Sequence, residues 1–204
     1  MPAVSETIVR EYFELHEFLV RQRGKYIDKT QRDEDDDIDF FVLNPHPQTP
    51  PGALPFVLRS PDLPFIRRAI VVVKAWHSKV FSQAQLAASP ETLRFADSKF
   101  FQQAARSFAE DGAATVLKIL VAPALPRLPK AREETIALLR AKGLDAVLPF
   151  RALLADLVNA VQVNRDYQKS DLLQTLRILK NYDLLKGPQL ELFKTRKASR
   201  PLKR

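Results

Sequence analysis

Two short apolar runs limit the folds open to this chain more than any other feature of its sequence. They cover residues 37–44, which read DIDFFVLN, and residues 69–76, which read AIVVVKAW. Both runs are too short for a typical helix and are rich in β-branched or aromatic residues, so they predict buried strands. The first run carries acids at its start, whereas Lys74 interrupts the second. Burying a lone lysine is costly, so we expect Lys74 to have a partner or a chemical task.

The remaining predicted elements follow an order that is typical of a layered α/β domain. An amphipathic helix at 4–16 with Ser5 as its N-cap comes first, and residues 44–64, which hold seven of the fifteen prolines, are expected to be irregular. Strands and helices then alternate, which predicts a mixed sheet. The other expected elements are a strand at 18–27, a helix from Ser89 to Phe108, a strand at 116–121, a helix at 131–142, a strand at 144–148, and helices at 149–163 and 171–185.

The charge of the chain favours a polyanionic partner. Its formal net charge is +8, with 32 basic and 24 acidic residues. Residues 194–204 hold six basic residues and no acid, and residues 33–39 hold six acids and no base. Setting both segments aside leaves 26 basic and 18 acidic residues, so the body of the chain also carries +8. Nucleic acid is the commonest partner of such a body, and a basic protein with a solvated tail is the alternative.

Several function classes are excluded or disfavoured by what the sequence lacks. The chain has no cysteine, so it forms neither a disulfide framework nor a thiolate metal site. It has five glycines and no phosphate-binding loop, dinucleotide fingerprint or nucleophile-elbow motif. The N-terminus shows no basic-then-apolar signal, and no apolar run approaches the length of a membrane span. We therefore expect a cytoplasmic protein that does not enter a membrane.

The order of elements and two charged positions together resemble the PD-(D/E)XK superfamily of restriction-endonuclease-like nucleases. The core of that family runs helix, three strands, helix, strand, and residues 4–121 follow the same order. Asp39 matches the acid on the second strand of the family, and Lys74 matches the lysine of the third. Val72 stands two residues before the lysine, where the family motif has an acid. Glu6 matches a glutamate on the first helix of members resembling the archaeal Holliday-junction resolvases.

The resemblance implies a fold and a division of the chain. The expected fold is a restriction-endonuclease-like three-layer α/β domain with a central mixed sheet, followed by a helical C-terminal extension. The expected core covers residues 1–148 and the extension covers residues 149–193. Residues 194–204 are expected to form a disordered basic tail.

The resemblance also implies a DNA endonuclease that depends on Mg²⁺, with Mn²⁺ as the alternative cation. Asp39, Glu6 and Asp37 would bind the metal, and Lys74 would act beside Asp39 in catalysis. Valine cannot ligate a cation through its side chain, so three alternatives remain open. The missing acid comes from another element (Glu6, Asp37, Glu91 or Asp97), or the site is inactive and the fold only binds nucleic acid or another protein. In the third alternative the resemblance is accidental, and Lys74 pairs with Asp37 or Asp39 in a purely structural domain.

Basic residues near the C-terminus are the candidates for contacting nucleic acid. The helix at 171–185 carries Arg177 and Lys180 opposite its leucines, and these residue types contact DNA in recognition helices. An ordinary packing helix with a solvated face is the alternative. The tail residues Lys194, Arg196 and Lys197 are expected to contact phosphates without reading sequence. We expect duplex DNA rather than RNA as the partner, and the sequence leaves open whether the chain forms a homodimer.

Overall fold

The computed structural model describes residues 2–22, 38–74, 80–89, 92–93, 96, 98–106, 108 and 116–185. The chain divides into two compact units, Met1–Ala160 and Val161–Arg204. This division falls after the helix at 150–160, whereas the sequence placed the end of the core at residue 148. The first unit contains α1 (Pro2–Leu15), β1 (Leu19–Gln22), β2 (Phe40–Leu43), the 3₁₀ helix η1 (Ser60–Phe65), β3 (Arg68–Val73), α2 (Gln83–Ala88), α3 (Ser98–Arg106), β4 (Leu117–Ala122), α4 (Pro129–Ala141), β5 (Ala146–Pro149) and α5 (Phe150–Ala160).

The five strands form one mixed sheet in the order β1-β2-β3-β4-β5. β1 pairs antiparallel with β2 and β2 antiparallel with β3, and the remaining pairs are parallel. The register places Phe40 opposite Val71 and Val72 opposite Leu120. The expected α/β architecture with a mixed sheet is therefore confirmed, and the two apolar runs lie on neighbouring strands.

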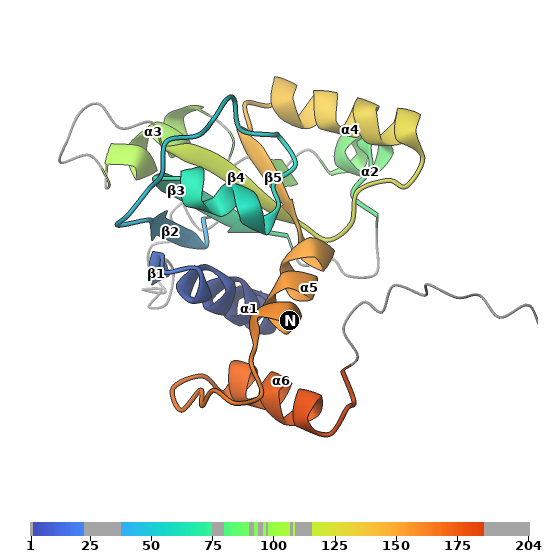
Figure 1. Ribbon diagram of the computed structural model, residues 1–204. Coiled ribbons are helices and arrows are strands. Elements are labelled where there is room, and N and C mark those ends of the chain that lie inside the picture. Colours follow the sequence, from blue (N-terminus) through green and yellow to red (C-terminus); the bar gives the residue numbers. More distant parts are fainter. Residues whose placement is uncertain are drawn as a thin grey trace, which may run out of the picture. The chain divides into compact units, whose positions relative to one another are not determined.

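Helices cover both faces of the sheet, as Figure 1 shows for the first unit. α1 and α5 contact each other and cover one face. α2, α3 and α4 cover the other face, where their buried Leu86, Ala104 and Leu139 share one apolar cluster with Val72 and Leu120. Because side chains alternate along a strand, Phe40 and Phe41 serve opposite faces, and Phe41 is the one that belongs to this cluster.

Two helix boundaries differ from those expected. α1 begins at Pro2, so Ser5 is a buried residue inside the helix and not its N-cap. The helix expected from Ser89 to Phe108 begins later than predicted, because Ser89 ends α2 and α3 spans Ser98–Arg106. Ser82 caps α2 by accepting a hydrogen bond from the Gln85 main-chain N–H at 3.3 Å, and Ser89 ends that helix. α2 contains six residues, which is too short for its periodicity to stand out in a sequence.

The proline-rich excursion at 44–64 contains more structure than its sequence predicts. Val57 forms a parallel bridge with Val147, and the Leu58 N–H donates to the Val147 carbonyl at 2.8 Å. η1 follows with Leu63 buried. The excursion is therefore fixed to the β5 side of the sheet and packs against the core through its apolar residues.

The second unit is described as far as residue 185. Its helix, α6 (Asp171–Asn181), begins at the expected place, because the Ser170 hydroxyl accepts a hydrogen bond from the Leu173 N–H at 3.2 Å. The helix ends before residue 185, where the sequence placed its end. In the part of the chain that the structure describes, no helix combines the length and the apolar character that crossing a membrane requires.

The buried phenol of Tyr12 makes the stability of the first unit depend on alkaline pH. Burial raises the pKa of Tyr12 well above its ordinary value, with Asp156 and Asp62 adding to the effect and the hydrogen bond to Ser60 opposing it. The unfolded chain loses this proton near pH 10, whereas the folded chain keeps it. The stability that Tyr12 contributes through this difference is therefore complete below pH 10 and is lost as the pH rises.

We expect Tyr12→Phe to flatten this alkaline loss of stability. At neutral pH the variant loses the hydrogen bond between the Tyr12 hydroxyl and Ser60 Oγ, which are 3.2 Å apart, and about 1 kcal/mol of unfolding free energy with it. Urea unfolding of both proteins at neutral pH and above pH 10 measures the difference. Equal losses of stability in the two proteins at high pH would contradict the prediction.

Candidate functional site

Asp39 is held at the end of the β2–β3 ladder by two hydrogen bonds to β3. Its main-chain N–H donates to the Val71 carbonyl at 3.2 Å. Its carboxylate Oδ2 accepts a hydrogen bond from the Val73 N–H at 2.6 Å. The side chain therefore takes the place of a main-chain acceptor where the pairing of β2 and β3 stops. Asp39 is half-buried, and only one of its two carboxylate oxygens is needed for this contact.

Lys74 follows directly on β3 and stays within the sheet. Its main-chain N–H donates to the Val121 carbonyl at 3.0 Å, which continues the parallel pairing with β4 by one residue. The residue is half-buried. By the alternation of side chains along a strand, Lys74 follows Val72 on the sheet face that α2, α3 and α4 cover. Asp39 and Lys74 thus flank neighbouring strands of one sheet, since Asp39 directly precedes β2 and Lys74 directly follows β3.

Val72 belongs to the hydrophobic core. Its side chain is fully buried in the apolar cluster that also contains Ile70 and Leu120. The position at which the family motif has an acid is therefore filled by a packing residue.

Glu6 reaches the same end of the sheet from α1. Its Oε2 accepts a hydrogen bond from Gln22 Nε2 at 2.9 Å, and Gln22 lies opposite Phe40 in the register of β1 and β2. Gln22 was not singled out in the sequence, which holds no signal for a contact between residues on different elements. Glu6 therefore lies on the α1 side of the sheet, which is the face opposite to the one on which Lys74 follows Val72.

The described residues near Asp39 offer a divalent cation few carboxylate ligands. Mg²⁺ is commonly held by one or two carboxylates together with water and substrate phosphates. Among the residues with a described placement, no three His, Cys, Asp or Glu side chains gather into a group that could hold a metal. Of the predicted acids, Asp39 has a described placement next to β3, and Asp37, Glu91 and Asp97 lie outside the described residues. A site with one carboxylate would bind a cation weakly until a phosphate supplied further oxygens.

The two candidate DNA contacts on α6 make hydrogen bonds within the second unit. Lys180 Nζ donates to the Val161 carbonyl at 2.6 Å, and Arg177 Nε donates to the Val163 carbonyl at 2.9 Å. Arg177 also lies 3.8 Å from a carboxylate oxygen of Asp166. These contacts hold the segment before α6 in place. A role of Arg177 and Lys180 in DNA binding stays a prediction. Lys194, Arg196 and Lys197 lie outside the described residues.

The excess of positive charge is concentrated in the second unit. Residues 1–160 hold 21 basic and 20 acidic residues, whereas residues 161–204 hold 11 basic and 4 acidic residues. The net charges are therefore +1 and +7. The acidic segment at 33–39 belongs to the first unit and supplies six of its 20 acidic residues. The charge that favours a polyanion is thus separated from Asp39 and Lys74 along the chain.

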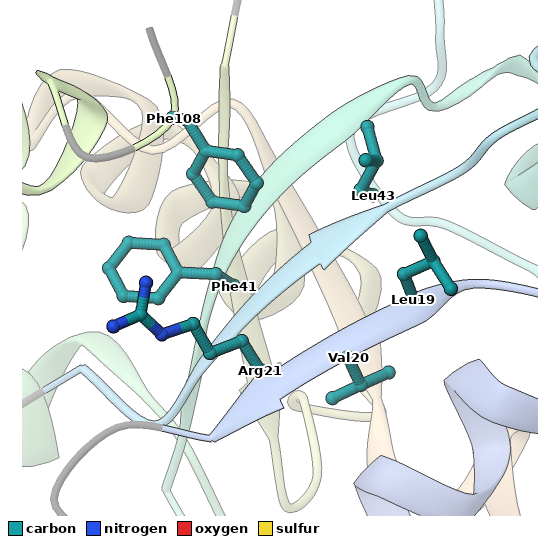
Figure 2. Close-up of a pocket in the computed structure, with 6 residues that line it drawn as sticks. All are labelled: Leu19, Val20, Arg21, Phe41, Leu43 and Phe108. Atoms are coloured by element: carbon teal, nitrogen blue, oxygen red, sulfur yellow. The ribbon is translucent and has the colours of Figure 1, made fainter. Parts of the chain in front are cut away.

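A pocket that sequence analysis did not anticipate opens beside β1 and β2. Figure 2 shows the residues around it, and its volume is about 220 Å³. The Phe41 and Phe108 rings meet edge to face with their centroids 5.0 Å apart. The pocket brings β1 and β2 together with Phe108, which follows α3 in the chain, and no spacing in the sequence could reveal this contact. Its lining consists of Leu19, Val20, Arg21, Phe41, Leu43 and Phe108.

Searches with this chain find no matching family model, no matching curated protein and no matching solved structure.

Proposed function

We propose that this chain is a cytoplasmic, nuclease-like DNA-binding protein whose first unit has a restriction-endonuclease-like fold. The order α1, β1, β2, β3, helices, β4 supports this fold, because the family core has the same order. The observation that carries the proposal is the position of Asp39, whose carboxylate lies 2.6 Å from the Val73 N–H directly before Lys74. An acid and a lysine on adjacent strands, at the end where the strands stop pairing, is the arrangement that the resemblance implies.

Cleavage at this site is expected to be weak or absent. A bound Mg²⁺ or Mn²⁺ would polarise a phosphodiester and supply hydroxide. Asp39 would hold that cation, and the Lys74 ammonium would stabilise negative charge on the phosphate. With Val72 in the core, the described part of the chain places no carboxylate at the position where the family motif has its second acid. The cation and the DNA phosphate would then depend on each other for binding.

A structural role is the second candidate function of the Asp39 region. The hydrogen bond from the Val73 N–H to Asp39 is one that a residue selected only for stability would also make. In that case the domain would serve protein interaction or packing, and cations would not affect it. Replacing Asp39 by asparagine separates the two candidates, because asparagine keeps an acceptor oxygen and removes the charge.

We expect the second unit to supply most of the affinity for DNA. Replacing the six basic residues of 194–204 by glutamine should weaken binding to duplex DNA and flatten its dependence on salt, because each lost phosphate contact lowers the slope by about 0.9. The preference among DNA sequences should not change. Fluorescence anisotropy of labelled duplexes over a series of salt concentrations measures both quantities.

A matched variant controls for total charge. Replacing six exposed basic residues of the first unit by glutamine removes the same charge from the other unit, for example at Arg59, Arg67, Arg127, Lys130, Arg132 and Lys142. This variant should retain most of the salt slope. If the full-length protein does not bind duplex DNA at low ionic strength, the positive charge serves another purpose and the DNA-binding proposal is wrong.

A further inference from the structure

β1 forms an edge of the sheet, and one face of it carries the pocket. β2 pairs with one side of β1, and no described strand pairs with the other side. Leu19 and Arg21 lie opposite Leu43 and Phe41 in the register, so all four side chains share one face. Figure 2 shows these four residues and Phe108 around the pocket. A sheet edge with an apolar pocket on one face is the geometry that accepts an added strand.

Leu19 is exposed in a way that a protected edge strand would avoid. Its side chain is 62% exposed, although it lies on the pocket face of β1 beside Leu43. Edge strands normally carry charges, prolines or bulges that prevent pairing with other chains, and Arg21 is the one such charge on β1. The exposed apolar side chain of Leu19 is thus placed where an incoming strand would cover it.

The charge of the pocket favours an acidic partner. Arg21 is the one charged residue among those that line the pocket, and it is exposed. No ion pair of Arg21 is found within the described parts of the chain. Opposite charges on directly opposed residues of two strands stabilise their pairing, and like charges destabilise it. A partner strand is therefore best matched when it places an acid opposite Arg21.

In the registers centred on Leu19, Val20 or Arg21, which the described residues cover, a second copy of this chain fits the edge poorly. In an antiparallel pair, directly opposed residues point to the same side of the sheet. In a symmetric pair of two β1 strands, one residue must therefore lie opposite its own copy, and the pair is centred on that residue. Centring on Val20 would place Leu19 opposite Arg21 of the second copy, and centring on Arg21 would oppose two arginines. Centring on Leu19 would require Glu17 to be extended, but Glu17 lies in the turn after α1 with a φ of 65°.

We propose that the edge of β1 binds an extended acidic segment of another protein by strand addition. The bound segment places an apolar side chain over the pocket beside Leu19 and an acidic side chain opposite Arg21. Because alternate residues of a strand share a face, these two side chains are two positions apart. This inference concerns a different surface from the Asp39 region and does not rest on the proposed binding of DNA.

The probe is a fluorescein-labelled synthetic peptide of roughly six residues, the usual length of a strand. It carries leucine and glutamate two positions apart, with valine and threonine elsewhere. We expect the full-length protein to bind this peptide, and backbone amide signals of residues 19–22 to shift in NMR spectra. Leu19→Thr and Arg21→Gln should each weaken binding by about two- to fivefold.

Three controls test whether the edge itself is the site. Leu128→Thr removes a leucine that is 73% exposed at the start of α4, and this variant should bind as the unchanged protein does. A peptide with lysine in place of glutamate should bind more weakly, and N-methylation of its pairing amides should abolish binding. The proposal is overturned if the peptide does not bind, or if Leu19→Thr and Arg21→Gln bind it unchanged. It is also overturned if sedimentation shows a dimer that Leu19→Thr dissociates, because a second copy would then occupy the edge.

Discussion

Replacing Val72 by glutamate is expected to lower the free energy of unfolding at neutral pH by several kcal/mol, on the order of 4. Val72 is fully buried, and its neighbours on the same face include Ile70 and Leu120. A carboxylate there loses its hydration, which raises its pKa above the ordinary value for glutamate. The loss of stability should therefore become smaller as the pH falls. Urea unfolding at neutral and mildly acidic pH measures both effects.

A divalent cation is expected to restore part of the lost stability of Val72→Glu. The new carboxylate would stand beside Asp39 and two residues before Lys74, and together they would complete the acidic pair that the family motif contains. A cation that binds the folded state stabilises it by mass action, so Mn²⁺ should raise the unfolding midpoint of this variant.

Val71→Glu is the matched control for this cation effect. Val71 is also fully buried and adjacent in sequence, but its side chain alternates to the α1 face of the sheet. Val71→Glu should lose similar stability and show no response to Mn²⁺. An equal response of the two variants, or none in either, would place Asp39 and Lys74 outside any cation site.

Asp39→Ala and Asp39→Asn are expected to separate the structural contribution of this residue from its charge. Alanine leaves the Val73 N–H without its acceptor, which costs roughly 1–3 kcal/mol of unfolding free energy. Asparagine keeps an acceptor oxygen at the same place and should lose about 1 kcal/mol or less. Both variants remove the carboxylate, so both should lose any effect of a cation on DNA binding.

Comparison of the two Asp39 variants shows which candidate function holds. If the residue has a purely structural role, Asp39→Asn should behave as the unchanged protein does in every binding assay. Chemical denaturation provides the stability of each variant, and DNA binding with and without Mn²⁺ provides the functional measurement. A strongly destabilised Asp39→Asn would mean that the charge itself is needed for folding, which the proposed cation site does not predict.

The sheet could be predicted from the sequence because its strands are short apolar runs that are recognisable without knowledge of the tertiary structure. The runs at 37–44 and 69–76 are apolar and bounded by turn formers, and they correspond to β2 and β3. Ser170 predicted the start of α6 because capping depends on a single side chain and the next turn. Ser89 was wrongly predicted to begin a helix, because a serine before a proline and an acid is a local signal that also occurs where a short helix ends.

The candidate site could be predicted only in part, because its other features depend on tertiary structure. The alternation along β3 places Val72 on the same face as Lys74, but its complete burial arises from helices far along the chain. The contact between Glu6 and Gln22 joins α1 to β1, and the pocket joins Phe41 to Phe108. The separation of charge between the two units became apparent once the unit boundary was known.

The affinity for duplex DNA with and without Mn²⁺, compared between the unchanged protein and Asp39→Asn, tests the central proposal most directly. A site with one carboxylate needs oxygens of the DNA phosphate to complete the coordination of its cation. Mn²⁺ should therefore strengthen DNA binding by the unchanged protein by about tenfold, or 1.4 kcal/mol. Asp39→Asn should bind DNA with the same affinity whether or not Mn²⁺ is present. An identical response to Mn²⁺ in the two proteins, with DNA binding intact in both, would contradict a nuclease-like cation site at Asp39.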